Sequence, residues 1–192
     1  MKRIVLLIAL VAALALCAGA QTDINFQQMP LVQTPTLMPD SYPEGMNLYW
    51  NSFYYVTPGL WSGAGPGFWI DPATQHNTVA FIGGPTCNSR VPCSGSIKLN
   101  PIVLAPLNRT FTPVSISLSA GWLPNRVTVM AYNNSRFVGS VVWNLGTIPQ
   151  TFTFPTAWNV TQLVFTPDFI NMTPVNHGAA SMVVYNFTLI AH

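Results

Sequence analysis

The sequence predicts an all-β fold, an antiparallel sandwich of two sheets, and three observations support this. Apolar and polar residues alternate along "VSISLSAGW", residues 114–122, which is the pattern of a strand with one buried face. Seventeen prolines and thirteen glycines divide the chain into short segments, as expected for strands joined by turns. No apolar stripe of useful length has helical spacing. Two sheets packed on a common core satisfy all three observations.

A hairpin is expected in the second half of the chain. The segments "RVTVMAY" (126–132) and "FVGSVVWNL" (137–145) flank "NNSR", whose asparagines suit a turn with positive φ. Trp122 and Trp143 each continue the apolar alternation of their segments, so both are expected in the core. Further strands are expected in "MNLYWNSFYYV", "NTVAFI", "GSIKL", "TFTF", "TQLVF" and "SMVVYNFTLIAH".

Two of these strands carry more specific predictions. In "GMNLYWNSFYYV", Met46, Leu48 and Trp50 are expected to face the core, and a bulge at the Asn51–Ser52 step would turn Phe53 inward as well. Tyr49, Tyr54 and Tyr55 would then remain at the surface. In "MVVYNFTLI", the alternation predicts one face with Val183, Tyr185, Phe187 and Leu189, and an opposite, solvent-facing side with Asn186.

The first twenty residues have the layout of a secretory signal peptide. Lys2 and Arg3 precede an apolar run from Ile4 to Leu16, and Ala18-Gly19-Ala20 provides small residues for cleavage. The run is too short for a membrane span. We therefore expect a signal peptide at 1–20, an irregular proline-containing arm at 21–41 and a β-sandwich domain at 42–192. The product is expected to be extracellular and secreted, with association to a cell wall as one setting.

Charge is scarce in the secreted chain. Without Lys2 and Arg3, five of the seven basic residues remain against five acidic residues, so the net charge is zero. A neutral surface offers no electrostatic footprint for nucleic acid. We expect neither a nucleic-acid partner nor a membrane span.

Export also determines how the cysteines and asparagines are interpreted. Cys87 and Cys93, in "CNSRVPC", most simply form a disulfide that closes a small loop. A metal site is the competing interpretation, but His76, His177 and His192 add no recognisable ligand spacing. We expect no metal and no cofactor. Five N-x-S/T sequons predict N-glycosylation, at Asn108, Asn133, Asn159, Asn171 and Asn186.

Little in the sequence favours an enzyme. Glycoside hydrolysis needs two positioned carboxylates, and Asp40 and Glu44 lie beside prolines where turn roles are expected. The stretch "WSGAG" lacks the strand–turn–helix context of a nucleophile elbow, and "GAGPG" has no phosphate-loop spacing. A copper oxidase with an N-terminal histidine brace is disfavoured because the expected first residue is Gln21. No catalytic residue is predicted.

The order of the strand segments resembles a known family. The succession "YPEGMNLYWNSFYYV", "NTVAFIGG", "FTPVSISLSAGW", "RVTVMAYNNSRFVGSVVWNL", "TFTFPTAWNVTQLVF" and "MVVYNFTLI" is similar to secreted jelly-roll domains of bacterial proteins with a PEP-CTERM sorting tail and of their fungal relatives. Met46, Leu48, Trp50 and Phe53 approximate the family's opening motif. Tyr185 stands where the family's closing strand has an acid, which removes one calcium ligand of related jelly rolls. We expect no sorting tail, because the sequence stops at His192. The resemblance implies a jelly-roll-like fold and an extracellular setting, and almost no activity.

Exposed aromatic rings are the best candidates for a functional site. Sugar faces stack on solvent-exposed Trp and Tyr rings, and "PGLWSGAGPGFWIDP" places Trp61 and Trp69 in a Gly/Pro-rich loop. We expect these two rings, with Tyr54 or Tyr55, to bind an extracellular polysaccharide or glycoprotein. The alternative for the rings is that they cover the end of the sandwich. The alternative for the protein is a structural or adhesive wall or matrix protein, or a secreted host-interaction effector, without glycan binding.

Overall fold

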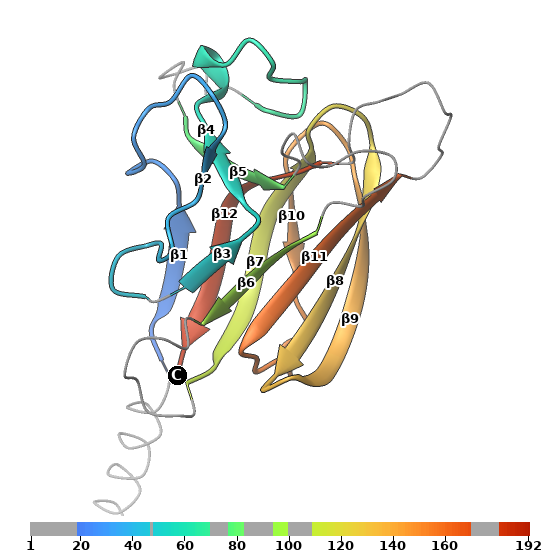
Figure 1. Ribbon diagram of the computed structural model, residues 1–192. Coiled ribbons are helices and arrows are strands. Elements are labelled where there is room, and N and C mark those ends of the chain that lie inside the picture. Colours follow the sequence, from blue (N-terminus) through green and yellow to red (C-terminus); the bar gives the residue numbers. More distant parts are fainter. Residues whose placement is uncertain (1–18, 47, 70–76, 83–93, 100–108, 170–180) are drawn as a thin grey trace, which may run out of the picture.

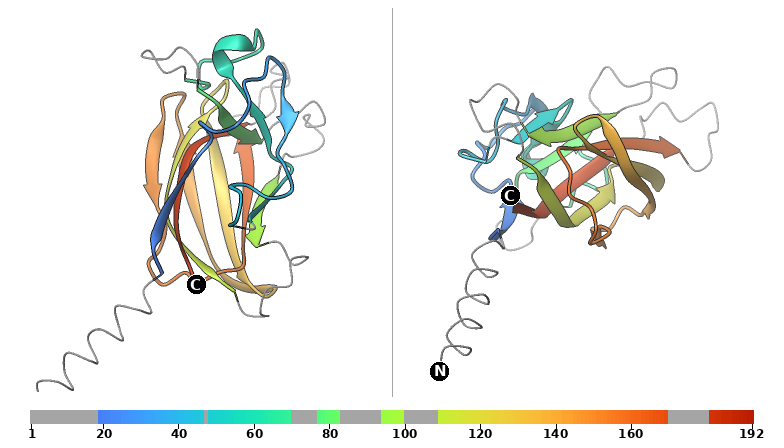
Figure 2. Two further views of the ribbon diagram at one scale, coloured as in Figure 1. Left: turned by 90° about the vertical axis from the view of Figure 1, so that its left-hand side faces the viewer. Right: turned by 90° about the horizontal axis from the view of Figure 1, so that it is seen from below.

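The computed structural model describes residues 19–46, 48–69, 77–82, 94–99, 109–169 and 181–192. Within these ranges the chain forms two antiparallel sheets packed face to face and one short 3-10 helix, Pro58–Leu60, without an α-helix (Figure 1). The predicted all-β sandwich is confirmed. Figure 2 shows the two layers from the side and from below.

Sheet A has seven strands and sheet B has five, counted over the described residues. Sheet A consists of β1 (Gln21–Asn25), β2 (Thr36–Leu37), β4 (Tyr54–Val56), β5 (Val79–Ile82), β7 (Phe111–Ala120), β10 (Gln150–Thr153) and β12 (Met182–Ala191). Sheet B consists of β3 (Leu48–Asn51), β6 (Gly95–Leu99), β8 (Asn125–Asn133), β9 (Arg136–Leu145) and β11 (Gln162–Phe169).

The connections between sheets follow the jelly-roll pattern. Strands β5 to β12 build two four-stranded sheets, in the orders β10-β7-β12-β5 and β6-β11-β8-β9. The chain changes sheet after every one of these strands except between β8 and β9, which form a hairpin within sheet B. Eight strands connected in this way are a double-sheet jelly roll. Strands β1, β2 and β4 extend sheet A and β3 extends sheet B.

Aromatic rings fill the space between the sheets. Trp50 and Phe53 are buried, with their ring centroids 5.2 Å apart in an edge-to-face contact. The indole Nε1 of Trp50 donates a hydrogen bond to the Tyr42 carbonyl at 2.7 Å, so the polar edge of this buried ring is satisfied. The prediction that Leu48, Trp50 and Phe53 face the core is confirmed, and Met46 is partly buried against the same core.

The expected bulge at Asn51–Ser52 is instead a passage between sheets. β3 ends at Asn51 in sheet B, and β4 begins at Tyr54 in sheet A. Ser52 has a φ of +61°, a left-handed conformation that turns the chain sharply. The two strands therefore approach the core from opposite sides, and Phe53 turns inward at the crossing.

The hairpin prediction is confirmed. β8 and β9 pair antiparallel around Asn134 and Ser135, whose φ values are +45° and +68°. Two consecutive left-handed residues match the twist of the flanking strands.

The two tryptophans of this region differ in their surroundings. Trp143 packs against the core as expected, stacked on Phe152 at 4.9 Å. Trp122 is not in the space between the sheets. β7 ends at Ala120, so the alternation stops and Trp122 packs over the outer face of sheet A.

The N-terminal segment differs from the expected irregular arm. Gln21–Asn25 forms β1, which pairs with β12 from Gln21–Ile190 to Asn25–Asn186. Ile24 is buried in the core, and the short β2 pairs with β4. Sheet A therefore includes part of the segment expected to be irregular. Residues 1–18 lie outside the described residues, so the signal peptide stays a prediction.

The single face predicted for β12 is wrong because the strand contains a bulge. The register shifts between Val184 and Asn186. Before it, Val184 faces the core while Val183 and Tyr185 pack on the outer face of sheet A; after it, Phe187 faces the core. Asn186 lies on the outer face beside Ser117.

Candidate functional site

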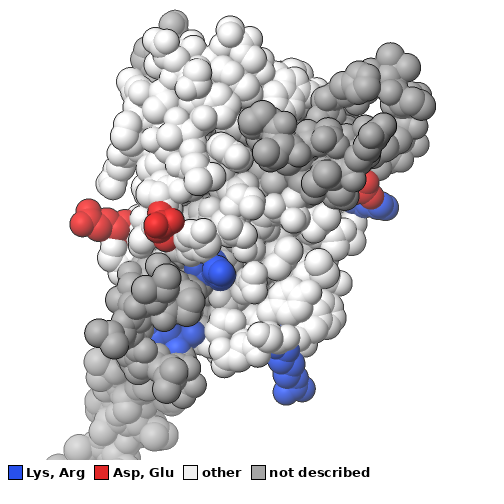
Figure 3. Space-filling model, in the orientation of Figure 1, with Lys and Arg blue, Asp and Glu red and all other residues white. Residues whose placement is uncertain are grey.

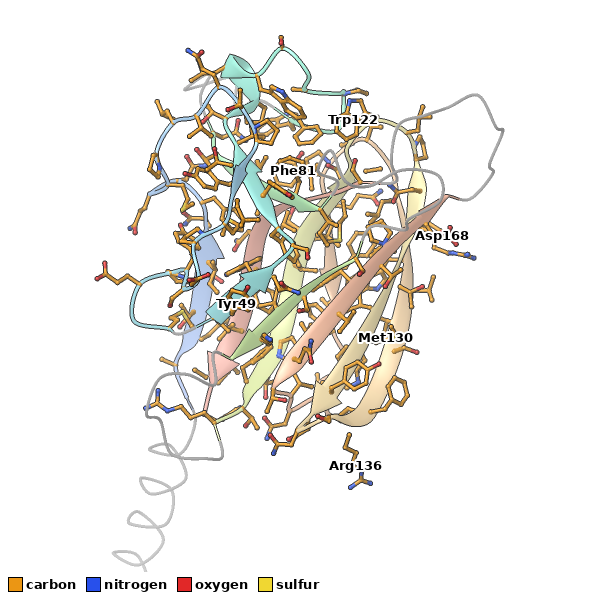
Figure 4. The ribbon with its side chains drawn as sticks, in the orientation of Figure 1. Tyr49, Phe81, Trp122, Met130, Arg136 and Asp168 are labelled. Carbon is orange, nitrogen blue, oxygen red and sulfur yellow. The ribbon has the colours of Figure 1, made fainter. Side chains whose placement is uncertain are left out.

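Most of the aromatic residues expected at a binding site pack together on the outer face of sheet A. The loop of residues 57–69 folds over the upper end of this face, and Figure 4 shows Phe81 and Trp122 there. We call this packing the outer cluster. It consists of buried Val56, Phe68, Val79, Phe81 and Val183, with Tyr54, Trp61, Ala64, Trp122 and Tyr185 packed against them.

Trp61 holds its loop against the sheet. Its ring stacks on Phe81 at 5.9 Å with an interplanar angle of 24°. It also makes edge-to-face contacts with Phe68 at 5.3 Å and Trp122 at 6.0 Å. Phe81 covers one face of the Trp61 ring, and Phe68 and Trp122 contact it edge to face. Trp61 therefore packs the loop against the sheet.

The two tyrosines next to this loop are also engaged. The ring of Tyr54 lies 6.0 Å from Phe81 and is partly buried. Tyr55 is only 8% exposed and belongs to the core between the sheets. The expectation that Tyr55 remains at the surface is wrong, because Phe53 and Tyr55 both point inward once the chain has entered sheet A.

Trp69 presents its indole to solvent. It is 45% exposed and makes no ring contact with another aromatic residue in the described part of the chain. Its backbone is held on both sides. The Trp69 N–H donates to the Tyr185 hydroxyl at 3.0 Å, and its carbonyl accepts from Asn77 Nδ2 at 2.9 Å. Among the four predicted rings, Trp69 is therefore the most exposed candidate for stacking.

Tyr185 joins the loop to the sheet. Besides accepting from Trp69, its hydroxyl donates to the Gly67 carbonyl and lies 3.0 Å from Ser119 Oγ. Ser119 Oγ also donates to the Gly67 carbonyl, at 2.5 Å. Burial raises the pKa of the Tyr185 phenol, and the hydrogen bonds with Ser119 and Trp69 offset part of this rise. These bonds hold the backbone of Gly67 and Trp69 against sheet A and so fix the position of the Trp69 side chain.

Below this junction the outer face of sheet A is lined by small polar side chains. Residues in register on neighbouring strands share a face, and two successive rows of this kind cross β1, β12, β7 and β10. We call them the polar floor. The rows are Asn25, Asn186, Ser117 and Thr151, and Asp23, Thr188, Ser115 and Thr153. With strands about 4.8 Å apart, each row spans roughly 14 Å.

The floor residues make few side-chain hydrogen bonds within the described part of the chain, and Thr188 is buried. Thr188 Oγ1 donates to Asp23 Oδ1 at 2.6 Å, and Asn25 Oδ1 accepts from the Gln27 N–H at 3.1 Å. The described residues provide no hydrogen-bond partner for the buried Asn186 Oδ1. The floor contains no aromatic and no basic side chain, and its largest member is asparagine.

Sequence reasoning missed the floor, although one signal was present. The alternation of "VSISLSAGW" predicted a serine face, and Ser115 and Ser117 lie on the floor. β12 and β10 flank β7, and β1 pairs with β12; no local pattern in the sequence reveals that these strands add Asp23, Asn186 or Thr151 to the same face.

The other predicted sites are placed as follows. Cys87, Cys93, Asn108 and Asn171 lie outside the described residues. Asn159 is exposed, and its carbonyl accepts from Asn133 Nδ2 at 3.1 Å. Asn186 is part of the floor. Among the described residues, no three His, Cys, Asp or Glu side chains gather as a metal site would require, and no helix has the length and apolarity to cross a membrane.

Comparison with known proteins finds solved structures of low sequence identity and partial structural similarity. No family model and no curated protein matches the chain. A DUF4465 family protein from Bacteroides ovatus is 9% identical, with a TM-score of 0.49 over 91% of this chain and 99% of that one. A mutant of the carbohydrate-binding module CBM29-2 is 9% identical, with a TM-score of 0.44 over 88% and 90%. The K1 cleaved adhesin domain of Lys-gingipain from Porphyromonas gingivalis is 12% identical, with a TM-score of 0.41 over 91% and 99%. At such identities and scores no function is transferred.

Proposed function

We propose that this is a secreted, non-catalytic protein that binds a neutral extracellular carbohydrate on the outer face of sheet A. The observation that carries the proposal is the polar floor next to the exposed indole of Trp69. Residues 1–20 are the proposed export signal. The described sequons Asn133 and Asn159 are proposed glycan carriers.

The chemistry of the face matches that of a sugar. A pyranose presents hydroxyl groups at its edges and C–H groups on its faces. Serine and threonine hydroxyls both donate and accept hydrogen bonds, and asparagine amides do the same with separate atoms. An exposed indole offers a surface for the C–H face. Trp69 stands at the border of the floor, because its N–H is bonded to Tyr185, the residue preceding Asn186 in β12.

The charge of the floor narrows the class of ligand. Asp23 is its one ionisable side chain, and its carboxylate already accepts from Thr188. An acidic polysaccharide would bring further negative charge without meeting a basic partner on the floor. A neutral glycan carries no such cost. A glycan attached to Asn186 would cover the floor, so the proposal requires that this sequon carry none.

The experiment measures binding of the secreted protein to neutral glucans, xylans, mannans and chitin, with polygalacturonate and heparin as acidic comparisons. At least one neutral glycan should bind and the acidic ones should not. Trp69→Ala should weaken binding about tenfold or more, which corresponds to about 1.4 kcal/mol. The pair Ser117→Ala and Thr151→Val should also weaken it. Tyr49→Ala, on the outer face of sheet B, is the matched control and should bind like wild type.

Two results would overturn the proposal. One is that the wild-type protein binds no glycan of the panel. The other is that the Trp69 variant and the floor variant retain full affinity for a glycan that the wild type binds, which would place the ligand elsewhere.

A further inference from the structure

β9 is an edge strand of sheet B in the described part of the chain. In the sheet order β3-β6-β11-β8-β9, this ten-residue strand pairs with β8 on one side and with no described strand on the other (Figure 1). An edge of this kind presents a row of backbone N–H and C=O groups that can pair with another strand.

The strand has few of the features that usually protect an edge. Lysine, acidic residues and proline are absent from "RFVGSVVWNL", and Arg136 stands at its first position. One register shift occurs, where Ala131 pairs with Gly139 and Tyr132 with Phe137, so Val138 is the extra residue. The bulge lies near one end and leaves Gly139–Leu145 in regular register with β8.

Apolar side chains accompany the open backbone. Phe137, Val138 and Val142 are 55%, 38% and 56% exposed. On β8, Met130 and Tyr132 adjoin them on the same outer face, and the rings of Tyr132 and Phe137 lie 5.8 Å apart. Charged side chains are few and scattered on this side of the molecule (Figure 3). Contiguous exposed apolar residues are typical of interaction surfaces.

We propose that β9 is a homodimer interface, in which two copies pair antiparallel through this strand and join their B sheets into one. An antiparallel strand pair is self-complementary about a twofold axis. An axis centred on the regular segment 139–145 places Val142 opposite Val142 of the second copy. The two Arg136 side chains then lie at opposite ends of the pairing, so like charges do not meet. A charged partner would find no complementary charge on the patch.

Dimerisation would change how the proposed carbohydrate face is displayed. An axis that pairs two edge strands runs perpendicular to the joined sheet, so the outer faces of both A sheets point in the same direction. If the proposed function holds, the two polar floors of a dimer could bind one polysaccharide surface at the same time. The dimer would then bind this surface more tightly than one copy does.

Sedimentation velocity of the full secreted chain over a range of concentrations tests the interface. The wild type should be a dimer that dissociates on dilution. Val142→Lys, at an exposed position, should be monomeric at concentrations where the wild type is dimeric, and Phe137→Lys should act in the same way. Leu31→Lys changes a residue that is 60% exposed and lies in the N-terminal segment, outside β9, and should remain dimeric.

Hydrogen exchange shows whether the contact involves β9. Alternate amides of residues 139–145, those that point away from β8, should become protected as concentration rises, while the amides of β3, the opposite edge, should not. A wild type that is monomeric throughout would overturn the proposal, as would a dimer that both lysine variants retain. Soluble oligosaccharide affinity should be equal in monomer and dimer, so loss of dimerisation and absence of glycan binding give separate results.

Discussion

The hydroxyl group of Tyr185 connects the two parts of the proposed site. It joins the Trp69 N–H, the Gly67 carbonyl and Ser119 at the border between the outer cluster and the polar floor. Sequence alternation assigned Tyr185 to the same face as Phe187, because a period-two pattern assumes an uninterrupted ladder. The bulge beside it sends the two rings to opposite faces of sheet A, and the pattern of apolar residues contains no signal for it.

Tyr185 should make the protein sensitive to alkaline pH. Burial raises the pKa of its phenol above the ordinary value of 10.0, so the unfolded chain loses this proton at lower pH than the folded protein. The stabilisation is complete below about pH 10 and is lost as pH rises through the folded pKa. Burial also raises the pKa of the Tyr42 phenol. The free energy of unfolding, measured in urea between about pH 8 and pH 11, should therefore fall with pH.

The substitution Tyr185→Phe separates the contribution of Tyr185 to the alkaline loss of stability from that of Tyr42. The variant should lose roughly 1 kcal/mol at neutral pH, because the Trp69 N–H loses its acceptor, and its alkaline decline should be shallower than that of the wild type. Tyr49→Phe removes a phenol from the outer face of sheet B and should leave the decline in place. Equal slopes in Tyr185→Phe and wild type would contradict the prediction.

At the scale of elements, the β8–β9 hairpin shows what local sequence can predict. Both strands and their turn follow from alternation and from "NNSR", since turn chemistry and side-chain period are local properties. β1 was missed for the complementary reason. "QTDIN" has one buried apolar residue, Ile24, and its strand conformation depends on pairing with β12, which lies at the other end of the chain.

A glycine in the β8–β9 turn should stabilise the protein. Ser135 has a φ of +68°, where a residue with a Cβ is disfavoured and glycine is not. Ser135→Gly should raise the free energy of unfolding by about 0.5–1 kcal/mol, measured in protein made without glycosylation because the change also removes the Asn133 sequon. Ser140→Gly, within β9, is the matched control and should be neutral or destabilising. Destabilisation by Ser135→Gly would contradict the turn geometry.

At the scale of the whole molecule, the fold class was predictable but the placement of the site was not. Strand patterns reveal which residues are buried, and the order of segments resembled a jelly roll. The polar floor exists because β1, β12, β7 and β10 become neighbours, through pairs of residues that are as far apart in the sequence as Asp23 and Thr188. Burial periodicity carries no information about such neighbours.

The core should make the sandwich a single cooperative unit. Phe187 on β12 in sheet A contacts Trp50 on β3 in sheet B, as well as Phe111 and Phe154. Phe187→Ala should lower the free energy of unfolding by about 3–5 kcal/mol, with tryptophan fluorescence and far-UV circular dichroism reporting one coincident transition. Phe137→Ala, at an exposed ring, should lose about 1 kcal/mol or less. Two separate transitions would show that the sheets unfold independently.

The pairing of β1 with β12 has a mechanical consequence. Gln21 lies opposite Ile190, so a pulling force applied between the two ends of this ladder separates its residue pairs one at a time. Such unzipping needs far less force than sliding two strands past each other, because the hydrogen bonds never share the load. Asp23 and Asn25 would leave the polar floor as β1 peels away. Tension between the two ends of this ladder would therefore remove two polar side chains from the proposed sugar-binding face.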